Sequence, residues 1–177
     1  MKFKIFTTIC LIFFVSTSSS LYANDIYGGA NLSSIDMNFT GISGGTNFTV
    51  FSGRIGKRWN KNISSELRLG FGFGDDMIGD YIFKVRNLFG AYLKAGIPVS
   101  YNFYPYVIIG QTRGKFSKLD PWEGEVLVES DSGTSFGAGA DYNISNASSL
   151  NIEFLKYMDL DDEADLSGLS IGLAKKF

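Results

Sequence analysis

Residues Leu166 to Phe177 read LSGLSIGLAKKF and end on the last residue of the chain. Apolar side chains alternate here with small or polar ones, so that Leu169, Ile171, Leu173 and Phe177 share one face. Such period-two alternation predicts a β-strand with one apolar face. Chain termini usually fray, whereas the last strand of a closed barrel must hydrogen-bond to the first. The stretch therefore predicts a closed barrel.

The same alternation recurs along the chain. It is most regular over residues 63–74, where apolar residues from Leu67 to Phe73 alternate with Glu66, Arg68 and glycines. Eight strands are predicted over residues 26–36, 48–60, 63–74, 83–96, 104–112, 135–144, 150–158 and 166–177. The pattern does not settle which face of the two strands at 83–96 and 104–112 points outward. We expect an all-β fold, an eight-stranded antiparallel up-and-down transmembrane β-barrel.

The connections between the predicted strands alternate in length. Short turns are expected at residues 60–62, 97–102 and 145–149, and longer, more polar loops at 37–47, 75–82, 113–134 and 159–165. Most of the acidic residues lie in the last three of these loops. Short periplasmic turns and long extracellular loops are typical of outer-membrane barrels. We therefore expect the long acidic loops at the cell surface.

The amino end predicts export. Lys2 and Lys4 precede an apolar run over residues 5–15, and cleavage is expected after Ala23. Residues 1–23 are thus predicted to be a signal peptide and residues 24–177 a single barrel domain. The only cysteine, Cys10, lies in that predicted signal, and the chain has no histidine. Histidine-based and cysteine-based catalysis are excluded, a basic patch for nucleic acid is lacking, and we expect neither an enzyme nor a cofactor.

Four charged residues are predicted to point into the barrel. Arg54, Arg58, Glu66 and Arg68 lie on the polar faces of two adjacent strands, and a turn near Lys61 brings Arg58 close to Glu66. Buried charges must be paired, so an internal salt-bridge network that fills the barrel is the favoured interpretation. A narrow, gated ion path is the alternative.

Two of the long loops carry candidate surface sites. The acidic run Asp159, Asp161, Asp162, Glu163 and Asp165 offers oxygen ligands for a divalent cation, although a solvated charge run is favoured because the spacing of a calcium loop is lacking. Phe116, Trp122 and the apolar residues 126–128 allow two interpretations. One is an exposed strand pair or an adhesive tip; the other is an extension of the barrel hairpin above the membrane or a place in the aromatic girdle.

Five segments in order resemble the small outer-membrane β-barrels of the OmpA membrane-domain and OmpX type, the porin-family proteins. They are Ile55 to Asn60, Ser65 to Gly70, Tyr104 to Gly110, Phe136 to Tyr142 and Ser170 to Phe177. Lys57 and Lys175 depart from the pattern, since an aromatic and an apolar residue are usual there. The resemblance implies that Gly172, Leu173 and Phe177 form a signal for the barrel assembly machinery.

The sequence thus predicts a monomeric protein of the bacterial outer membrane, in contact with outer-membrane lipid and lipopolysaccharide. We expect a structural or surface-interaction role, in which the acidic loops meet an extracellular or host surface ligand. A narrow pore for ions or small solutes is one alternative. A secreted, lipocalin-like ligand-binding barrel is another, because periodicity alone does not tell which face lies inside.

Overall fold

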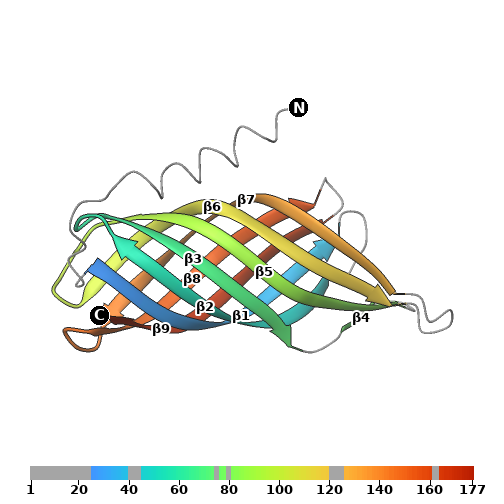
Figure 1. Cartoon of the computed structure of the whole chain (residues 1–177), viewed down its shortest axis with the longest axis horizontal. Coiled ribbons are helices and arrows are strands. Elements are labelled where there is room, and N and C mark those ends of the chain that lie inside the picture. The colour runs from blue at the N-terminus through green and yellow to red at the C-terminus, as the bar shows by residue number, and fades with distance from the viewer. Residues whose placement is uncertain (1–24, 40–44, 74–75, 79–80, 120–125, 161–163) are drawn as a thin grey trace.

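The computed structural model describes residues 25–39, 45–73, 76–78, 81–119, 126–160 and 164–177, in which eight long antiparallel strands close into a barrel (Figure 1). The long strands are β1 (Ile26–Phe39), β2 (Gly45–Arg58), β3 (Ile63–Phe73), β5 (Tyr81–Gly96), β6 (Phe103–Leu119), β7 (Val126–Asn143), β8 (Ser148–Leu160) and β9 (Ala164–Lys176). A short strand, β4 (Asp76–Ile78), pairs with β5 and, among the described residues, with no other strand. The predicted all-β barrel of eight antiparallel strands is confirmed.

The barrel closes at two seams. Neighbouring strands follow the order β3-β2-β1-β9-β8-β7-β6-β5, and β3 pairs with β5 to complete the ring. β1 and β9 pair along their whole lengths, from Tyr27 opposite Lys176 to Phe39 opposite Ala164. The backbone N–H of Phe177 also donates to the carbonyl oxygen of Ile26 at 3.1 Å. The last strand therefore pairs with the first, as the alternating carboxyl end predicts.

The two ends of the barrel differ. We call the end with the connections at 59–62, 97–102 and 144–147 the turn end; β1 begins and β9 ends there (Figure 1). The opposite end, with the connections through 40–44, 74–80, 120–125 and 161–163, is the loop end. The turn after β2 is held by the side chain of Asn60, whose Oδ1 accepts the N–H groups of Asn62 and Ile63, both at 2.8 Å. Such an Asx turn explains the tight reversal.

The outer wall is apolar and the interior is mixed. Exposed apolar side chains line the outside of the strands, for example Phe51, Leu69, Ile109 and Phe154. Arginines, glutamates and hydroxyl side chains alternate with them and point inward, where they are buried. This is the reverse of a lipocalin, which keeps apolar residues inside. Among the described residues, no helix has the length and hydropathy needed to cross a bilayer.

One predicted loop is largely strand. The segment 113–134 was expected as a loop, but β6 and β7 remain paired from Phe103 opposite Tyr142 up to Leu119 opposite Val126. The loop prediction was wrong because regular apolar alternation stops above Gln111, while backbone pairing continues through a mostly polar stretch. The hairpin therefore extends beyond the apolar wall, one of the two alternatives left open for this region. β4 likewise lies inside the connection predicted at 75–82.

Candidate functional site

A network of buried charges fills the turn-end half of the lumen, with Arg68 of β3 at its centre. The Arg68 Nε and Nη2 atoms donate to Glu66 Oε2 at 2.8 and 2.6 Å. Its Nη1 and Nη2 atoms donate to the two carboxylate oxygens of Glu153 on β8, at 2.5 and 2.9 Å. Both glutamate side chains have no exposed surface. A single guanidinium thus joins two carboxylates from opposite sides of the barrel.

Further groups complete the network. Lys94 of β5 lies 3.1 Å from Glu66 and 3.2 Å from Asp141, and its amine sits over the ring of Tyr106 at 3.7 Å. The hydroxyl of Tyr106 donates to Glu153 Oε2, and that of Tyr27 to Glu66 Oε1, each at 2.7 Å. Each carboxylate therefore has several donors, as buried charges require.

The predicted interior residues divide into two groups. Arg54, Glu66 and Arg68 lie together in the lumen, and the Nη1 atom of Arg54 is 3.7 Å from Glu66. Arg58 stands apart, half-buried near the turn end, because the register sets it opposite Ser64 while Gly56 lies opposite Glu66. The residue opposite Glu66 on β2 is thus midway between Arg54 and Arg58, and of these two arginines only Arg54 forms an ion pair with Glu66 among the described residues.

Sequence reasoning missed Lys94, Asp141 and Glu153. Each occupies an inward position between outward residues, as Glu153 does between Ile152 and Phe154. The sequence therefore did mark these residues, because a charged residue between two outward-facing residues must point inward. The pairing partner was not visible, because each of these residues lies far along the chain from the group that it contacts.

The loop-end half of the lumen is largely apolar instead, with Thr46 and Ser117 as buried polar exceptions. Its inward apolar side chains come from β1, β2, β5, β8 and β9 and are all buried: Ile35, Met37, Phe48, Val50, Val85, Leu88, Leu155, Met158 and Leu166. We call these residues the apolar layer. Hydrophobic constrictions close pores by excluding water. The lumen therefore combines a neutralised charge network with an apolar seal.

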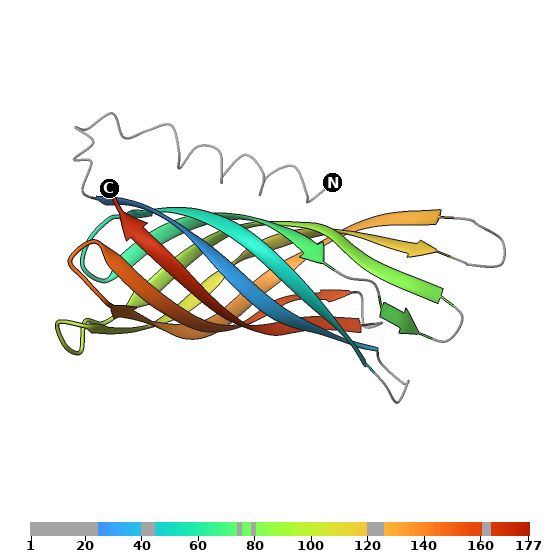
Figure 2. The ribbon, with the colours of Figure 1, turned by 90° about the horizontal axis from the view of Figure 1, so that it is seen from below.

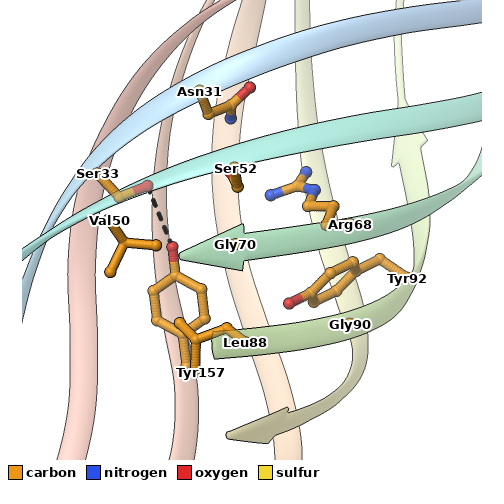
Figure 3. A pocket seen from close by; sticks show the side chains of 10 residues that line it. All are labelled: Asn31, Ser33, Val50, Ser52, Arg68, Gly70, Leu88, Gly90, Tyr92 and Tyr157. Atoms are coloured by element: carbon orange, nitrogen blue, oxygen red, sulfur yellow. Dashed lines mark hydrogen bonds between the residues drawn. The ribbon is translucent and has the colours of Figure 1, made fainter. Parts of the chain in front are cut away.

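A small cavity lies where the two halves meet (Figure 3). It has a volume of about 20 Å³ and is lined on one side by Arg68 and Tyr92 and on the other by Val50, Leu88 and Tyr157. The hydroxyl of Tyr157 points toward Ser33 across it, at 3.5 Å. Such a volume holds about one water molecule. The cavity is too small for a solute.

The candidate cation loop lies largely outside the described residues, which omit Asp161, Asp162 and Glu163. Backbone pairing sets Asp159 opposite Asp165. In the part of the chain that the structure describes, no group of three or more acidic, histidine or cysteine side chains is placed to hold a metal ion. The divalent-cation hypothesis for this loop stays a prediction.

The residues of the predicted assembly signal lie on both walls of β9. Leu173 and Phe177 point outward and are exposed, whereas Gly172 points inward. A Cβ atom on Gly172 would collide with the side chain of Asn31. Gly172 is therefore required for packing inside the barrel, in addition to any role in assembly.

A free strand edge projects at the loop end. β7 pairs with β6 up to Val126, but its pairing with β8 stops at Phe136 opposite Lys156. Figure 2 shows β6 and β7 extending well past the ends of β8 and β9. Residues 126–135 of β7, which we call the free edge, are thus paired on one side only among the described residues.

The closed antiparallel ring, the apolar outer wall and the filled, charged lumen define a small transmembrane β-barrel. The chain belongs to the family of outer membrane protein beta-barrel domains, which residues 6–177 match. It is accordingly a protein of the bacterial outer membrane, and the lipocalin-like alternative is wrong.

Solved structures with the same fold include three bacterial barrels. Ail, the attachment invasion locus protein of Yersinia pestis, is 13% identical, with a TM-score of 0.67 over 87% of this chain and 99% of Ail. Neisserial surface protein A is 14% identical, with a TM-score of 0.69 over 86% of this chain and 97% of that protein. The N-terminal barrel of Pseudomonas aeruginosa OprF is 13% identical, with a TM-score of 0.55 over 82% of this chain and 96% of the OprF barrel. No curated protein matches the sequence.

Proposed function

We propose that this protein is a non-conducting outer-membrane barrel that binds an extended polypeptide at the cell surface, through the free edge of β7. The observation that carries the proposal is the unpaired length of that strand, residues 126–135. An edge strand presents a row of unpaired N–H and C=O groups, to which another chain can add as a further strand. The loop end faces the exterior in this proposal, as is usual for such barrels.

The free edge lacks some of the usual protection against pairing. Natural edge strands are shielded by lysine, proline or a bulge, and residues 126–135 contain neither lysine nor proline. Leu127 and Val128 are half exposed, at 52% and 50%, and point to opposite faces. An added strand would cover both its backbone groups and some of this apolar surface. These features support a binding edge.

Charge on the edge favours a basic partner. Glu129 and Asp131 are two residues apart and so share a face of β7, and neither forms an ion pair among the described residues. An extended segment with Lys or Arg at alternate positions would set its cations opposite them. Ail was solved with a heparin analogue, sucrose octasulfate. The acids of the free edge here do not favour such a polyanion.

The filled lumen supports a role without conduction or catalysis. An ion would have to displace the Arg68 and Lys94 ion pairs and then cross the apolar layer. We therefore place the narrow pore second. The lack of histidine and of a recognisable acid pair argues against an enzyme. We expect a monomer, whose exposed outward cations Arg86, Arg113 and Lys115 suit the phosphates of lipopolysaccharide.

Binding of a labelled peptide with alternating Lys and Val residues, measured by fluorescence anisotropy on protein refolded in nanodiscs, tests the proposal. We expect saturable binding that the double substitution Glu129→Lys with Asp131→Lys abolishes. Asp36→Lys, an exposed acid on β1, is the matched control and should leave binding unchanged.

The same peptide with alternate N-methylated amides separates strand addition from charge attraction. N-methylation removes the backbone donors while keeping the charges, so the methylated peptide should not bind. Equal binding of the two peptides would refute strand addition.

A further inference from the structure

The two lysines that depart from the family pattern lie side by side on the outer wall. β1 runs between β2 and β9 near the turn end, as Figure 2 shows. Lys57 of β2 lies opposite Ile26 of β1, and Lys175 of β9 lies opposite Gly28. Two strand spacings and two residues of rise separate their Cα atoms by ~12 Å. Both side chains alternate with the outward residues Ile55 and Leu173, so they point to the same side of the sheet.

Neither lysine has an anionic partner. No ion pair joins Lys57 or Lys175 to a carboxylate within the described residues, including the exposed Asp25 just before β1. The amine of Lys57 lies over the ring of Trp59 at 4.5 Å instead. Lys175 has small neighbours on both sides, Gly28 on β1 and Ser148 on β8. Among the described residues, these two cations therefore face outward without an ion-pair partner.

Their depth in the membrane identifies the missing anion. Ile55 and Leu173, one outward position further from the turn end, are exposed at 56% and 57% and belong to the apolar wall. A lysine facing lipid is costly at mid-depth and tolerated at the interface, where it reaches the headgroups. At this level the available anions are phosphates. With the turn end toward the periplasm, they belong to phospholipids of the inner leaflet.

We propose that Lys57 and Lys175 together bind the phosphate of an anionic phospholipid, such as phosphatidylglycerol, in the inner leaflet. The four-carbon side chains flank Gly28 and the ring of Phe177 that lies over it, where a Cβ atom on Gly28 would come within 3.2 Å of that ring. The hydroxyl of Ser65 lies opposite Lys57 and is already engaged by the indole N–H of Trp59 at 3.0 Å, which fixes the ring beside the amine. The phosphate would thus be held by two cations, with an aromatic ring at its side.

The outer wall above the lysines has room for an acyl chain. Ala30 and Gly53 are small and lie directly opposite each other, one outward position further from the turn end than Gly28 and the Phe177 ring that covers it. A Cβ atom added to Gly53 would meet nothing within 4 Å. The taller side chains of Ile55 and Leu173 flank this strip. One acyl chain of a phospholipid can therefore lie along β1 while the phosphate of that lipid contacts the lysines. This fit favours a lipid over a protein partner.

Quenching of Trp59 by brominated lipid tests the site, because this residue lies beside Lys57. All fluorescence measurements use a protein that carries Trp122→Phe, so that Trp59 is the sole tryptophan. In vesicles with graded brominated phosphatidylglycerol or phosphatidylcholine, we expect phosphatidylglycerol to be preferred by about fivefold per lysine, since a basic residue near an anionic surface contributes ~1 kcal/mol. Lys57→Gln with Lys175→Gln should remove the preference, and the two Lys→Arg substitutions should retain it.

Lys61→Gln, in the exposed turn after β2, is the matched control and should leave the preference unchanged. Inorganic phosphate should not displace the lipid, because its acyl chain also contributes; displacement would mean that the lysines bind free phosphate only. An equal affinity for both lipids, or a preference that survives in the double Gln variant with intact heat-modifiable folding, would overturn the proposal. These outcomes are independent of peptide binding at the free edge.

Discussion

Substitution of Arg68 by methionine should be among the most destabilising single changes in the lumen. Methionine keeps much of the length of arginine but removes the charge and every donor. Arg68 supplies four hydrogen bonds to Glu66 and Glu153, whose side chains have no exposed surface. Removing one partner of a buried ion pair costs about 3–5 kcal/mol, because an uncompensated charge remains. We expect the free energy of unfolding to fall by that amount.

The structure also shows which glutamate accounts for the lost stability. Without Arg68, Glu66 retains Lys94 at 3.1 Å and the hydroxyl of Tyr27. Glu153 retains only the hydroxyl of Tyr106 as a side-chain donor among the described residues. The carboxylate left without an ion-pair partner is therefore that of Glu153. Adding Glu153→Gln to Arg68→Met should restore at least ~1 kcal/mol, since a neutral amide is cheaper to bury than a carboxylate.

Urea unfolding in lipid vesicles, followed by heat-modifiable gel migration and tryptophan fluorescence, measures these differences. Arg113→Met is the matched control: Arg113 is exposed on the outer wall, so its loss should change stability by no more than about 0.5 kcal/mol. The reasoning is refuted if Arg68→Met costs no more than Arg113→Met. It also fails if the Arg68→Met, Glu153→Gln double variant is no more stable than Arg68→Met alone.

Two further predictions concern conduction and assembly. Planar-bilayer recordings should show no conductance above background for the wild type, Arg58→Ala or Glu66→Ala, because the apolar layer closes the loop half in each; channel openings in any of them would contradict the seal. Deletion of Phe177 should reduce the amount of barrel assembled in the outer membrane of cells far more than the yield of refolding in vitro, since only one backbone hydrogen bond, to Ile26, is lost from the described fold. Equal losses in the two assays would show that Phe177 acts only as a strand end.

Much of the barrel could be predicted because lipid imposes a pattern on sequence. Every outward residue of a spanning strand meets hydrocarbon, so the apolar alternation in β3 and β9 is visible without any partner. The closure of β9 on β1 followed from the same pattern. Beyond the apolar wall this constraint ends, and the paired residues from Arg113 to Leu119 no longer alternate. Sequence reasoning therefore ended β6 and began β7 too far inside the membrane.

The lumen was harder to predict because its contacts depend on register across the whole ring. Arg54, Glu66 and Arg68 were found because they lie on adjacent strands joined by a short turn. Glu153 meets Arg68 only after the ring has closed. Charge alternation can mark a residue as inward-facing, but it does not tell which distant strand brings the opposite charge.

Two different features explain why β5 and β6 could not be oriented from the sequence. In β5 the register shifts between Val85 and Asn87, so Arg86 is an extra, bulged residue. Val85 and Leu88 both point inward although their numbers differ in parity. A single period of two therefore does not fit the strand. In β6 the pattern is hidden differently, because Tyr106 and Ile108 are apolar and buried while Val107 and Ile109 are apolar and exposed.

A second bulge connects the sealed lumen to the free edge. In β8 the register with β9 shifts between Lys156 and Met158, so Tyr157 is the extra residue. Tyr157 and Met158 consequently both point inward and are buried, which adds volume to the apolar side of the lumen. The carbonyl of Tyr157 accepts a hydrogen bond from Ser135 Oγ at 2.6 Å, and the backbone ladder between β7 and β8 ends just before it. Because bulges bend the strand that carries them, β8 and β9 diverge from β7 at this point. One local irregularity therefore contributes to closing the lumen and leaves residues 126–135 unpaired.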